Sequence, residues 1–229
     1  MSFTVEEAKR AIYIDFEGME RTDGVRQPPW LLGTLRDLEC HFYLMDPEMK
    51  ILSRGVETQL SREIPDEFKD YRFSCTFETD FDAVMEDLQQ RCTNGNRKLL
   101  AYSQAEEETI KMFAEPSLSA DVCKKIENAK LVIQSWWRRE VDAGRKKPLE
   151  KRTLKNYLRA AGYEHEVRQP ANVRSKLLNG IKGTHRWKNV GDDTRKRWYD
   201  ILLYNFKDCH GLEWLTRKAA RFYASDQPI

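Results

Sequence analysis

Four carboxylates at scattered positions have the residue types and spacing of a divalent-metal site. Asp15 and Glu17 end an apolar run that begins at Ala11, Glu106 opens a helix-like segment, and Asp208 lies far along the chain. Residues i and i+2 of a strand face the same side, so Asp15 and Glu17 share one space at the carboxyl end of the strand. Adjacent carboxylates repel each other unless a cation or a proton intervenes. A divalent metal supplies that charge.

The second acidic segment is Glu106 to Glu108, in the first turns of an expected helix. Acidic residues are common there, because the helix dipole favours them without any further role. Ile110 and Phe113 follow Glu106 by four and seven positions, so Glu106 lies on the inward, apolar edge of the helix. We expect Glu107 and Glu108 to point elsewhere.

Tyr204 and Asp208 lie four residues apart in an expected helix over 194–223. Side chains at i and i+4 share a helix face, so the phenol and the carboxylate can approach one reaction centre. As an isolated pair, a buried structural tyrosine and a solvated aspartate would be the more common interpretation.

The pattern predicts an α/β protein in which strands dominate the first part and helices the second. Asp80 is expected to cap a helix that ends near 94–96, and strand 98–102 leads directly into helix 104–113. Segments 18–27, 143–151 and 164–193 have turn or loop composition, and 45–76 reads as loop with one short helix. The other expected elements are strands 11–17, 29–35 and 38–44, and helices near 119–129, 131–142, 152–161 and 194–223.

Length and composition favour one domain over residues 1–229, since 40% hydrophobic content is enough for a substantial core. No apolar run approaches the roughly 18 residues of a membrane helix, and the N-terminus lacks the pattern of a signal peptide. We therefore expect a cytoplasmic protein with no membrane partner. The five cysteines are widely spaced and the four histidines form no spaced pair, which argues against a disulfide framework and a zinc hydrolase.

Charge is divided unevenly along the chain. Residues 1–115 hold 14 Lys and Arg against 24 Asp and Glu, a net of −10, whereas residues 116–229 hold 25 against 13, a net of +12. A basic half beside an acidic site suits an enzyme that binds a polyanion, although such charges are as often ordinary solvated surface. Aromatic rings beside cations suit single-stranded nucleic acid. The candidates for that contact are Trp137, Arg138, Arg139, Lys146, Lys147, Arg186 and Lys188. The alternative for one of the neighbouring tryptophans, Trp136 and Trp137, is a place in the core, because Leu131, Val132, Ile133 and Trp136 form an apolar helix face.

Three separated segments resemble the motifs of the DEDD superfamily of 3′→5′ exonucleases, in the order of that family. Ile12–Gly18 is similar to the first motif, Leu100–Glu106 to the second, and Tyr204–Asp208 to the Y-x-x-x-D of the third. Thr153–Leu158 resembles a Ser-Leu-Lys helix start that often lies between the second and third. The tyrosine four residues before the final aspartate places the resemblance in the DEDDy subgroup.

The resemblance implies a ribonuclease H-like mixed sheet flanked by helices, with a helical C-terminal half. It further implies two Mg²⁺ or Mn²⁺ ions on Asp15, Glu17, Glu106 and Asp208, and a Tyr204 that orients the attacking water. Glu106 stands where the family usually has Asp, and Glu107 is an alternative for that position. The expected activity is 3′→5′ hydrolysis of single-stranded DNA or RNA. An endonuclease of the same fold and an inactive module that binds nucleic acid or protein remain as alternatives.

Overall fold

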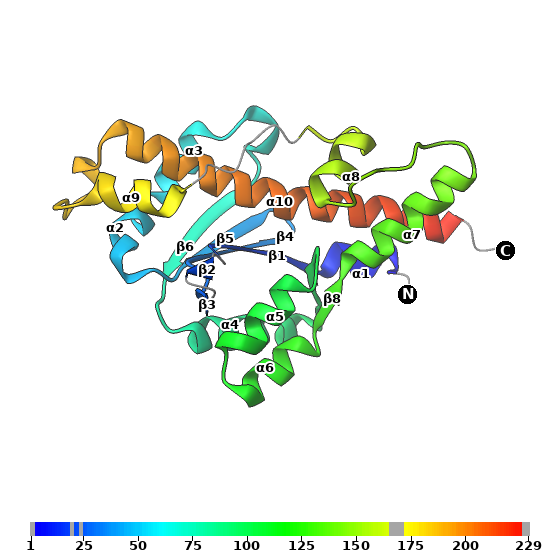
Figure 1. The fold of residues 1–229 in the computed structure, drawn as a ribbon, viewed down its shortest axis with the longest axis horizontal. Helices are drawn as coiled ribbons and strands as arrows, with labels where there is room; N and C mark the ends of the chain where they lie inside the picture. The colour runs from blue at the N-terminus through cyan, green and yellow to red at the C-terminus, as the bar shows by residue number, and fades with distance from the viewer. Residues whose placement is uncertain (1–2, 19–20, 23–24, 165–171, 226–229) are drawn as a thin grey trace.

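The computed structural model describes residues 3–18, 21–22, 25–164 and 172–225 and contains one mixed six-stranded sheet (Figure 1). The strand order is β6-β5-β4-β1-β7-β8. β1 pairs antiparallel with β4 and β4 antiparallel with β5, while β5/β6, β1/β7 and β7/β8 are parallel pairs. The strands are β1 (Ile12–Glu17), β4 (Leu31–Arg36), β5 (Glu39–Leu44), β6 (Arg72–Phe77), β7 (Leu99–Ala101) and β8 (Ile126–Asn128).

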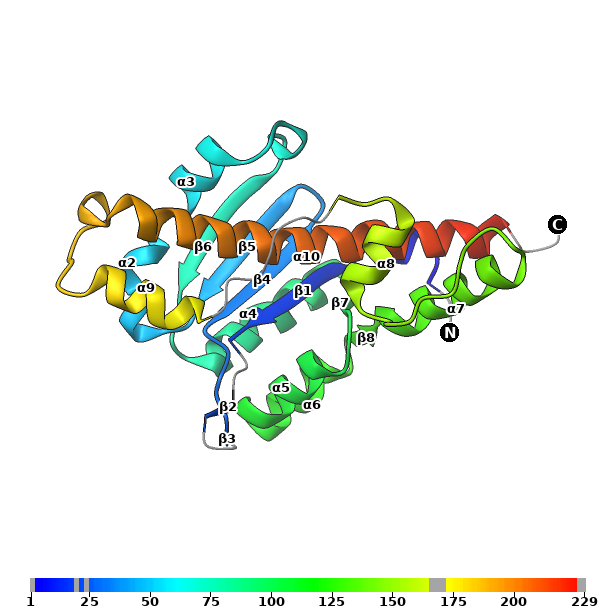
Figure 2. The ribbon, with the colours of Figure 1, turned by 45° about the horizontal axis from the view of Figure 1, so that its top comes forward.

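Helices cover both faces of this sheet, because β1 is apolar on both sides until its last residues. The long helix α10 (Asp192–Ser225) crosses one face from end to end, and α4 (Phe81–Gly95) and α5 (Ala105–Phe113) lie under the other (Figures 1 and 2). Tyr13 belongs to the core under α10, whereas its neighbours Ile12 and Ile14 belong to the core over α4. Asp15 and Glu17, at the same parity as Tyr13, therefore face α10.

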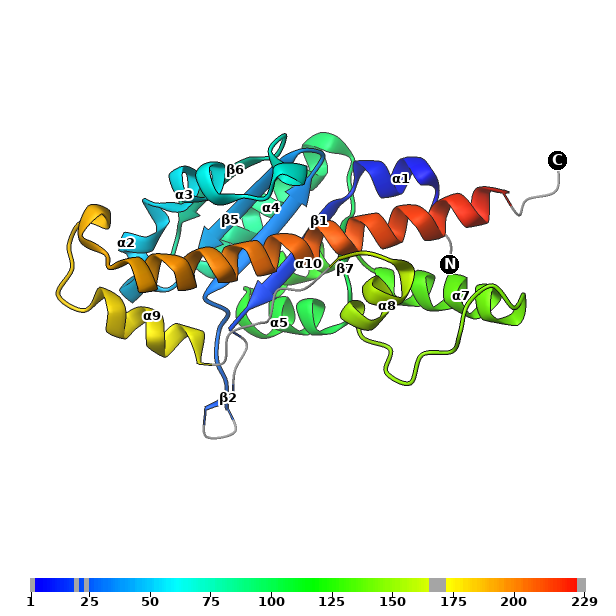
Figure 3. The same cartoon turned by 90° about the horizontal axis from the view of Figure 1, so that it is seen from above.

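Three of the other helices flank α10 along its length, whereas α6 packs against α4 and α5 on the opposite face of the sheet (Figure 1). α9 runs beside its N-terminal half, and α7 and α8 lie beside its C-terminal half (Figure 3). Gly211 of α10 lets α8 approach closely, since a Cβ there would come within 2.7 Å of the Leu158 side chain. The bounds of the helices besides α4, α5 and α10 are α1 (Val5–Arg10), α2 (Lys50–Ser53), α3 (Val56–Glu63), α6 (Pro116–Cys123), α7 (Ala129–Asp142), α8 (Leu154–Ala161) and α9 (Val173–Ile181), with short 3-10 turns at Pro47–Met49, Asp66–Phe68 and Trp187–Asn189.

Most of the predicted elements are present. The three-stranded meander, the strand before α5 and the helices near 131–142, 152–161 and 194–223 are confirmed within a few residues. Asp80 caps α4, because its side chain accepts a hydrogen bond from the backbone N–H of Asp82. No helix among the described residues is both long and apolar enough to cross a membrane.

Several elements differ from the sequence-based prediction. The helix expected over 119–129 is wrong at its end, because α6 stops at Cys123 and Ile126–Asn128 forms β8. The segment 45–76 contains the short helix that was expected, as α3, but it ends in the strand β6, which was not expected. α9 lies in the expected loop 164–193, of which 165–171 fall outside the described residues. In the expected turn 18–27, β2 (Arg21–Thr22) pairs with β3 (Val25–Arg26), and 19–20 and 23–24 fall outside the description.

Candidate metal centre

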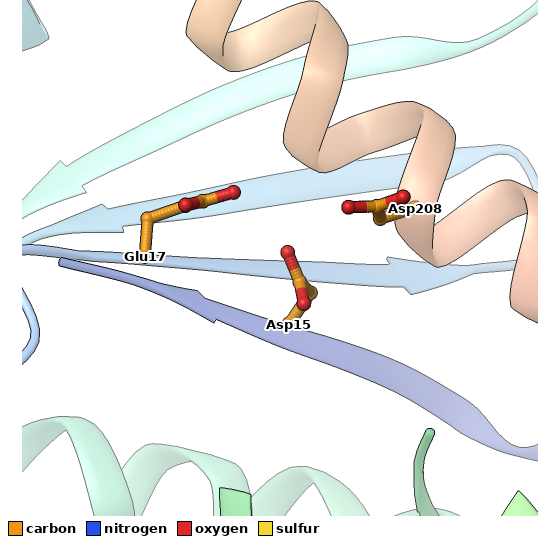
Figure 4. Close-up of side chains that lie close together, drawn as sticks. All are labelled: Asp15, Glu17 and Asp208. Carbon is orange, nitrogen blue, oxygen red and sulfur yellow. The ribbon is translucent and has the colours of Figure 1, made fainter. Parts of the chain in front are cut away.

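Three of the predicted acidic residues converge at one point between β1 and α10 (Figure 4). Asp15, Glu17 and Asp208 each offer a carboxylate oxygen, and these oxygens all lie within 4.8 Å of one another. Glu17 and Asp208 are 4% and 8% exposed. Residues separated by 193 positions in the sequence therefore form one compact set of hard oxygen donors, the type that Mg²⁺ and Mn²⁺ prefer.

Electrostatics within the cluster oppose three simultaneous negative charges. Burial raises the pKa of Asp15 well above its usual value, and the nearby carboxylates of Glu17, Asp208 and Glu106 raise it further. A divalent cation bound between these groups would reverse this effect, because it stabilises the ionised carboxylates. The residues present therefore fit a divalent metal.

Glu106 lies close enough to interact electrostatically with Asp15 and Asp208, but it is outside the set of oxygens that lie within 4.8 Å of one another. Its side chain is 6% exposed in the first turn of α5, where it accepts a hydrogen bond of 2.9 Å from the Ser103 hydroxyl. Burial is the main cause of its raised pKa, and the charge of Asp208 adds to the effect. Glu107 instead forms an ion pair with Lys111, one turn further along α5. Of the two glutamates considered for the second motif, Glu106 is the one that faces the cluster.

Tyr204 lies one turn before Asp208 on α10 and is 5% exposed. Burial raises the pKa of its phenol, and the charges of Asp208, Glu17 and Asp15 raise it further. Its hydroxyl is hydrogen-bonded to Asp208, and it therefore keeps its proton beside the carboxylates. The Lys155 ammonium lies 4.4 Å from the centre of the Tyr204 ring. This contact puts one cation of α8 next to the acidic cluster.

Asn205 fixes the position of Asp15 from α10. Its Nδ2 donates hydrogen bonds to the Asp15 carbonyl oxygen at 3.0 Å and to Asp15 Oδ2 at 2.8 Å. Gly33 stands opposite Asp15 in the β1/β4 register, and a Cβ at Gly33 would lie 1.6 Å from Asn205 Oδ1. The absence of a side chain at Gly33 thus makes room for the amide.

Asn205 was not among the predicted site residues, although the sequence contains a signal for it. Asn205 occupies a position in the apolar stripe that also contains Trp198, Leu202 and Cys209. It is fully buried, and its Oδ1 has no hydrogen-bond partner. A polar residue in the middle of a core-facing helix stripe requires a buried partner, and this requirement could have identified it.

The predicted nucleic-acid contacts form two separate groups. Arg139 stacks on Tyr223 near the end of α10, at 5.1 Å from the ring centre, and Arg138 and Lys147 are exposed in the same region. Lys188 lies at the other end, where its carbonyl oxygen accepts a hydrogen bond from Arg195. Arg195 and Tyr223 are separated by about 42 Å along the helix axis. Arg186, also exposed, belongs to the second group.

Trp137 does not provide the exposed ring that the sequence analysis expected. It is 4% exposed, and its indole Nε1 donates a hydrogen bond of 3.0 Å to the carbonyl oxygen of Lys147. Its ring also meets Tyr157 edge to face and lies 5.6 Å from the Lys146 ammonium. Trp137 and Trp136 are both buried on the apolar face of their helix. Trp137 therefore anchors the basic segment 143–151 to the core.

Comparisons with protein-family models, with curated proteins and with solved structures find no match to this chain. The motifs and the geometry of the cluster therefore provide the support for a function.

Proposed function

We propose that this chain is a metal-dependent nuclease of the DEDDy type that removes nucleotides from the 3′ end of single-stranded DNA or RNA. The observation that carries the proposal is the convergence of Asp15, Glu17 and Asp208 within 4.8 Å, with buried Glu106 facing the same centre. These four positions match the acidic residues of the three motifs. The negative charge of the cluster favours bound divalent cations. Phosphodiester hydrolysis can use two such ions roughly 4 Å apart.

The sheet supports the proposal. The antiparallel meander β1, β4 and β5 on one side of the site, with the parallel strands β7 and β8 on the other, is an arrangement expected of a ribonuclease H-like sheet. β6 then adds a strand beyond the meander. The helical C-terminal half supplies Tyr204 and Asp208 from α10.

In this proposal, Asp15, Glu17, Glu106 and Asp208 hold Mg²⁺ or Mn²⁺. When bound, such ions would activate a water at neutral pH and neutralise charge on the scissile phosphate. The Tyr204 phenol remains protonated among the carboxylates, so that it can donate a hydrogen bond and orient the attacking water. Asn205 holds Asp15 in a fixed orientation.

The cations that flank the acidic centre fit the phosphates of the substrate. Lys155 lies against the Tyr204 ring, and the exposed Arg138 and Lys147 continue the positive charge along the C-terminal half of α10. Such contacts bind the backbone without reading sequence. A single strand suits them, because it can bend from this surface into the buried carboxylates.

The test compares the wild type with Asp208→Asn and with Asp193→Asn, a matched control at an exposed acid near the start of the same helix. Each protein is incubated with 5′-labelled single-stranded DNA or RNA and with Mg²⁺, Mn²⁺ or a chelator. We expect stepwise shortening from the 3′ end by the wild type and the control, and none by Asp208→Asn or in chelator. The metal-free thermal stability of Asp208→Asn should be unchanged or higher, since one repulsive charge is lost.

The products also separate the rival functions. Internal fragments without stepwise shortening would indicate an endonuclease, and retention of the strand without cleavage would indicate a binding module. Cleavage by Asp208→Asn at the wild-type rate would refute the metal mechanism.

A further inference from the structure

The outer edge of the sheet, strand β6, has backbone groups that no described segment pairs. The N–H of Arg72 donates to the Leu38 carbonyl at 2.8 Å and that of Glu78 to the Leu44 carbonyl at 3.1 Å, so the even-numbered residues bond to β5. The N–H and C=O groups of Phe73, Cys75 and Phe77 therefore point away from the sheet. Within the described part of the chain, β6 is the last strand on this side.

This edge lacks the devices that usually prevent strands from pairing with other chains. Residues 73–77 contain no Pro, no Gly and no charge, and they follow β5 in an unbroken register. The charges of the segment stand only at its ends, with Arg72 before this stretch and Glu78 after it. An edge of this kind either pairs with a partner or promotes aggregation.

The sequence of the edge is nearly symmetric about Cys75. Phe73 and Phe77 lie two positions on either side of it, and Ser74 and Thr76 one position. Arg72 and Glu78, three positions away, carry opposite charges. In an antiparallel pair of two identical strands centred on Cys75, each residue therefore meets a similar one, and each terminal charge meets its opposite.

We propose that β6 binds the β6 strand of a second copy of this chain, in antiparallel register centred on Cys75. The outward N–H and C=O groups of Phe73 form hydrogen bonds with those of Phe77 in the second copy. The backbone N–H and C=O groups of the two Cys75 residues likewise form hydrogen bonds with each other. The register thus supplies six backbone hydrogen bonds, because three outward-facing residues on each copy form both a donor and an acceptor contact. The symmetry is that of a closed two-fold dimer.

The ion pairs at the ends of this register select it over its neighbours. Arg72 has a side chain that is 79% exposed and contacts Glu39 at 3.2 Å, so its guanidinium can accept a second carboxylate. Residues directly opposite each other in an antiparallel pair have Cβ atoms about 5 Å apart, within reach of Arg72 and Glu78. A slip by two residues would remove both ion pairs.

The two-fold axis would be perpendicular to the sheet, so like faces of the two copies point the same way. α3 packs on the face of β6 that carries Phe73, since Val56, Leu60 and Phe73 share one core. The opposite face borders a cavity of about 650 Å³ lined by His41, Ser74 and Arg91, among others. In the dimer, both acidic centres would open on the α10 side of one twelve-stranded sheet.

The test is the oligomeric state of the full chain, measured by sedimentation velocity and light scattering across a wide concentration range. The variants are Arg72→Glu, Glu78→Arg and the charge-swapped double variant, with circular dichroism as the check on folding. We expect a dimer for the wild type, dissociation in each single variant because like charges face each other, and recovery in the double variant. These readouts do not depend on nuclease activity, so the dimer and the proposed function can fail separately.

A second measurement uses Cys75 itself. A short bis-maleimide should link two copies of a Cys123→Ser variant and not of the variant that also carries Cys75→Ser. Cys40, Cys92 and Cys209 are buried, and Cys123 is half-buried like Cys75. Cys75→Pro should also dissociate the dimer, because it removes an outward N–H without touching the hydrogen bonds to β5. A monomer at every concentration would overturn the proposal, as would a dimer that all of these variants leave intact.

Discussion

Replacement of Gly33 by alanine should disturb the acidic centre without changing any acidic residue. The new Cβ would lie 1.6 Å from Asn205 Oδ1, far inside van der Waals contact, so the amide must move by more than an ångström. Its two hydrogen bonds to Asp15, now 3.0 and 2.8 Å long, would then be lost. One of them is made to a carboxylate, and together they are worth about 2–4 kcal/mol.

The expected results are a lower free energy of unfolding and weaker Mn²⁺ binding. We expect Gly33→Ala to lose about 2–4 kcal/mol in denaturant unfolding without metal. A ligand that loses its supporting hydrogen bond commonly binds metal about 10- to 100-fold more weakly, and Mn²⁺ calorimetry measures this. Gly191→Ala is the matched control, since a Cβ there meets nothing within 4 Å.

A double-mutant cycle tests the cause. Asn205→Ala alone should weaken stability and Mn²⁺ binding to a similar extent, because it removes the same two hydrogen bonds. In Gly33→Ala with Asn205→Ala, the colliding oxygen is absent, so the double variant should be no worse than Asn205→Ala. Additive losses, or wild-type stability and affinity in Gly33→Ala, would refute this explanation of how Asp15 is positioned.

Three further predictions address other parts of the molecule. Tyr204→Phe should lower kcat on a labelled strand by about a hundredfold with KM unchanged, and a parental rate would exclude the water-orienting role. Burial raises the pKa of the Glu213 carboxyl from 4.5 to about 7, so the folded state keeps this proton at pH values at which the unfolded chain has lost it. The contribution of this group to the free energy of unfolding is therefore complete below pH 4.5 and is lost as the pH rises through about 7. Unfolding free energy should thus fall by up to about 3 kcal/mol from about pH 5 to 8, and Glu213→Gln should flatten that slope if the group is responsible. Arg138→Gln with Lys147→Gln should weaken binding of a single strand and reduce its salt dependence, and an unchanged salt slope would point to Arg186 and Lys188.

The parts of the fold that sequence reasoning predicted are those in which pattern and packing agree. β1 is buried on both faces, and its apolar run shows this directly. α10, a helix of 34 residues, keeps an apolar stripe from Trp198 to Ala220. β8 has three half-buried residues and forms only because β7 lies beside it, so no local pattern distinguishes it from a helix end. β6, which also needs its neighbour, was missed for the same reason.

The acidic residues of the candidate site could be predicted from the sequence, whereas the residues that position them could not. Asp15 and Glu17 could be selected because they share one face at a strand end, and Asp208 because its segment resembles the third motif of a family whose first two motifs precede it in order. Asn205 and Gly33 depend on a close approach between α10 and β4, which no spacing in the sequence encodes. The division of the cations between the two ends of α10 likewise follows from the length of that helix.

The separation of Asp15 and Asp208 in the sequence also concerns the order of events during synthesis. Asn205 donates a hydrogen bond to Asp15, 190 positions earlier in the chain. Asp15 and Glu17 on β1 therefore gain their neighbours on α10 only after α10 has packed on the sheet. A ribosome-bound chain that lacks α10 has a partly exposed sheet and no complete carboxylate cluster. Contacts at such long range form late in folding, because loop closure must come first. An emerging chain would thus lack the complete carboxylate cluster, and with it the activity proposed above, until the part of the chain around the site had folded.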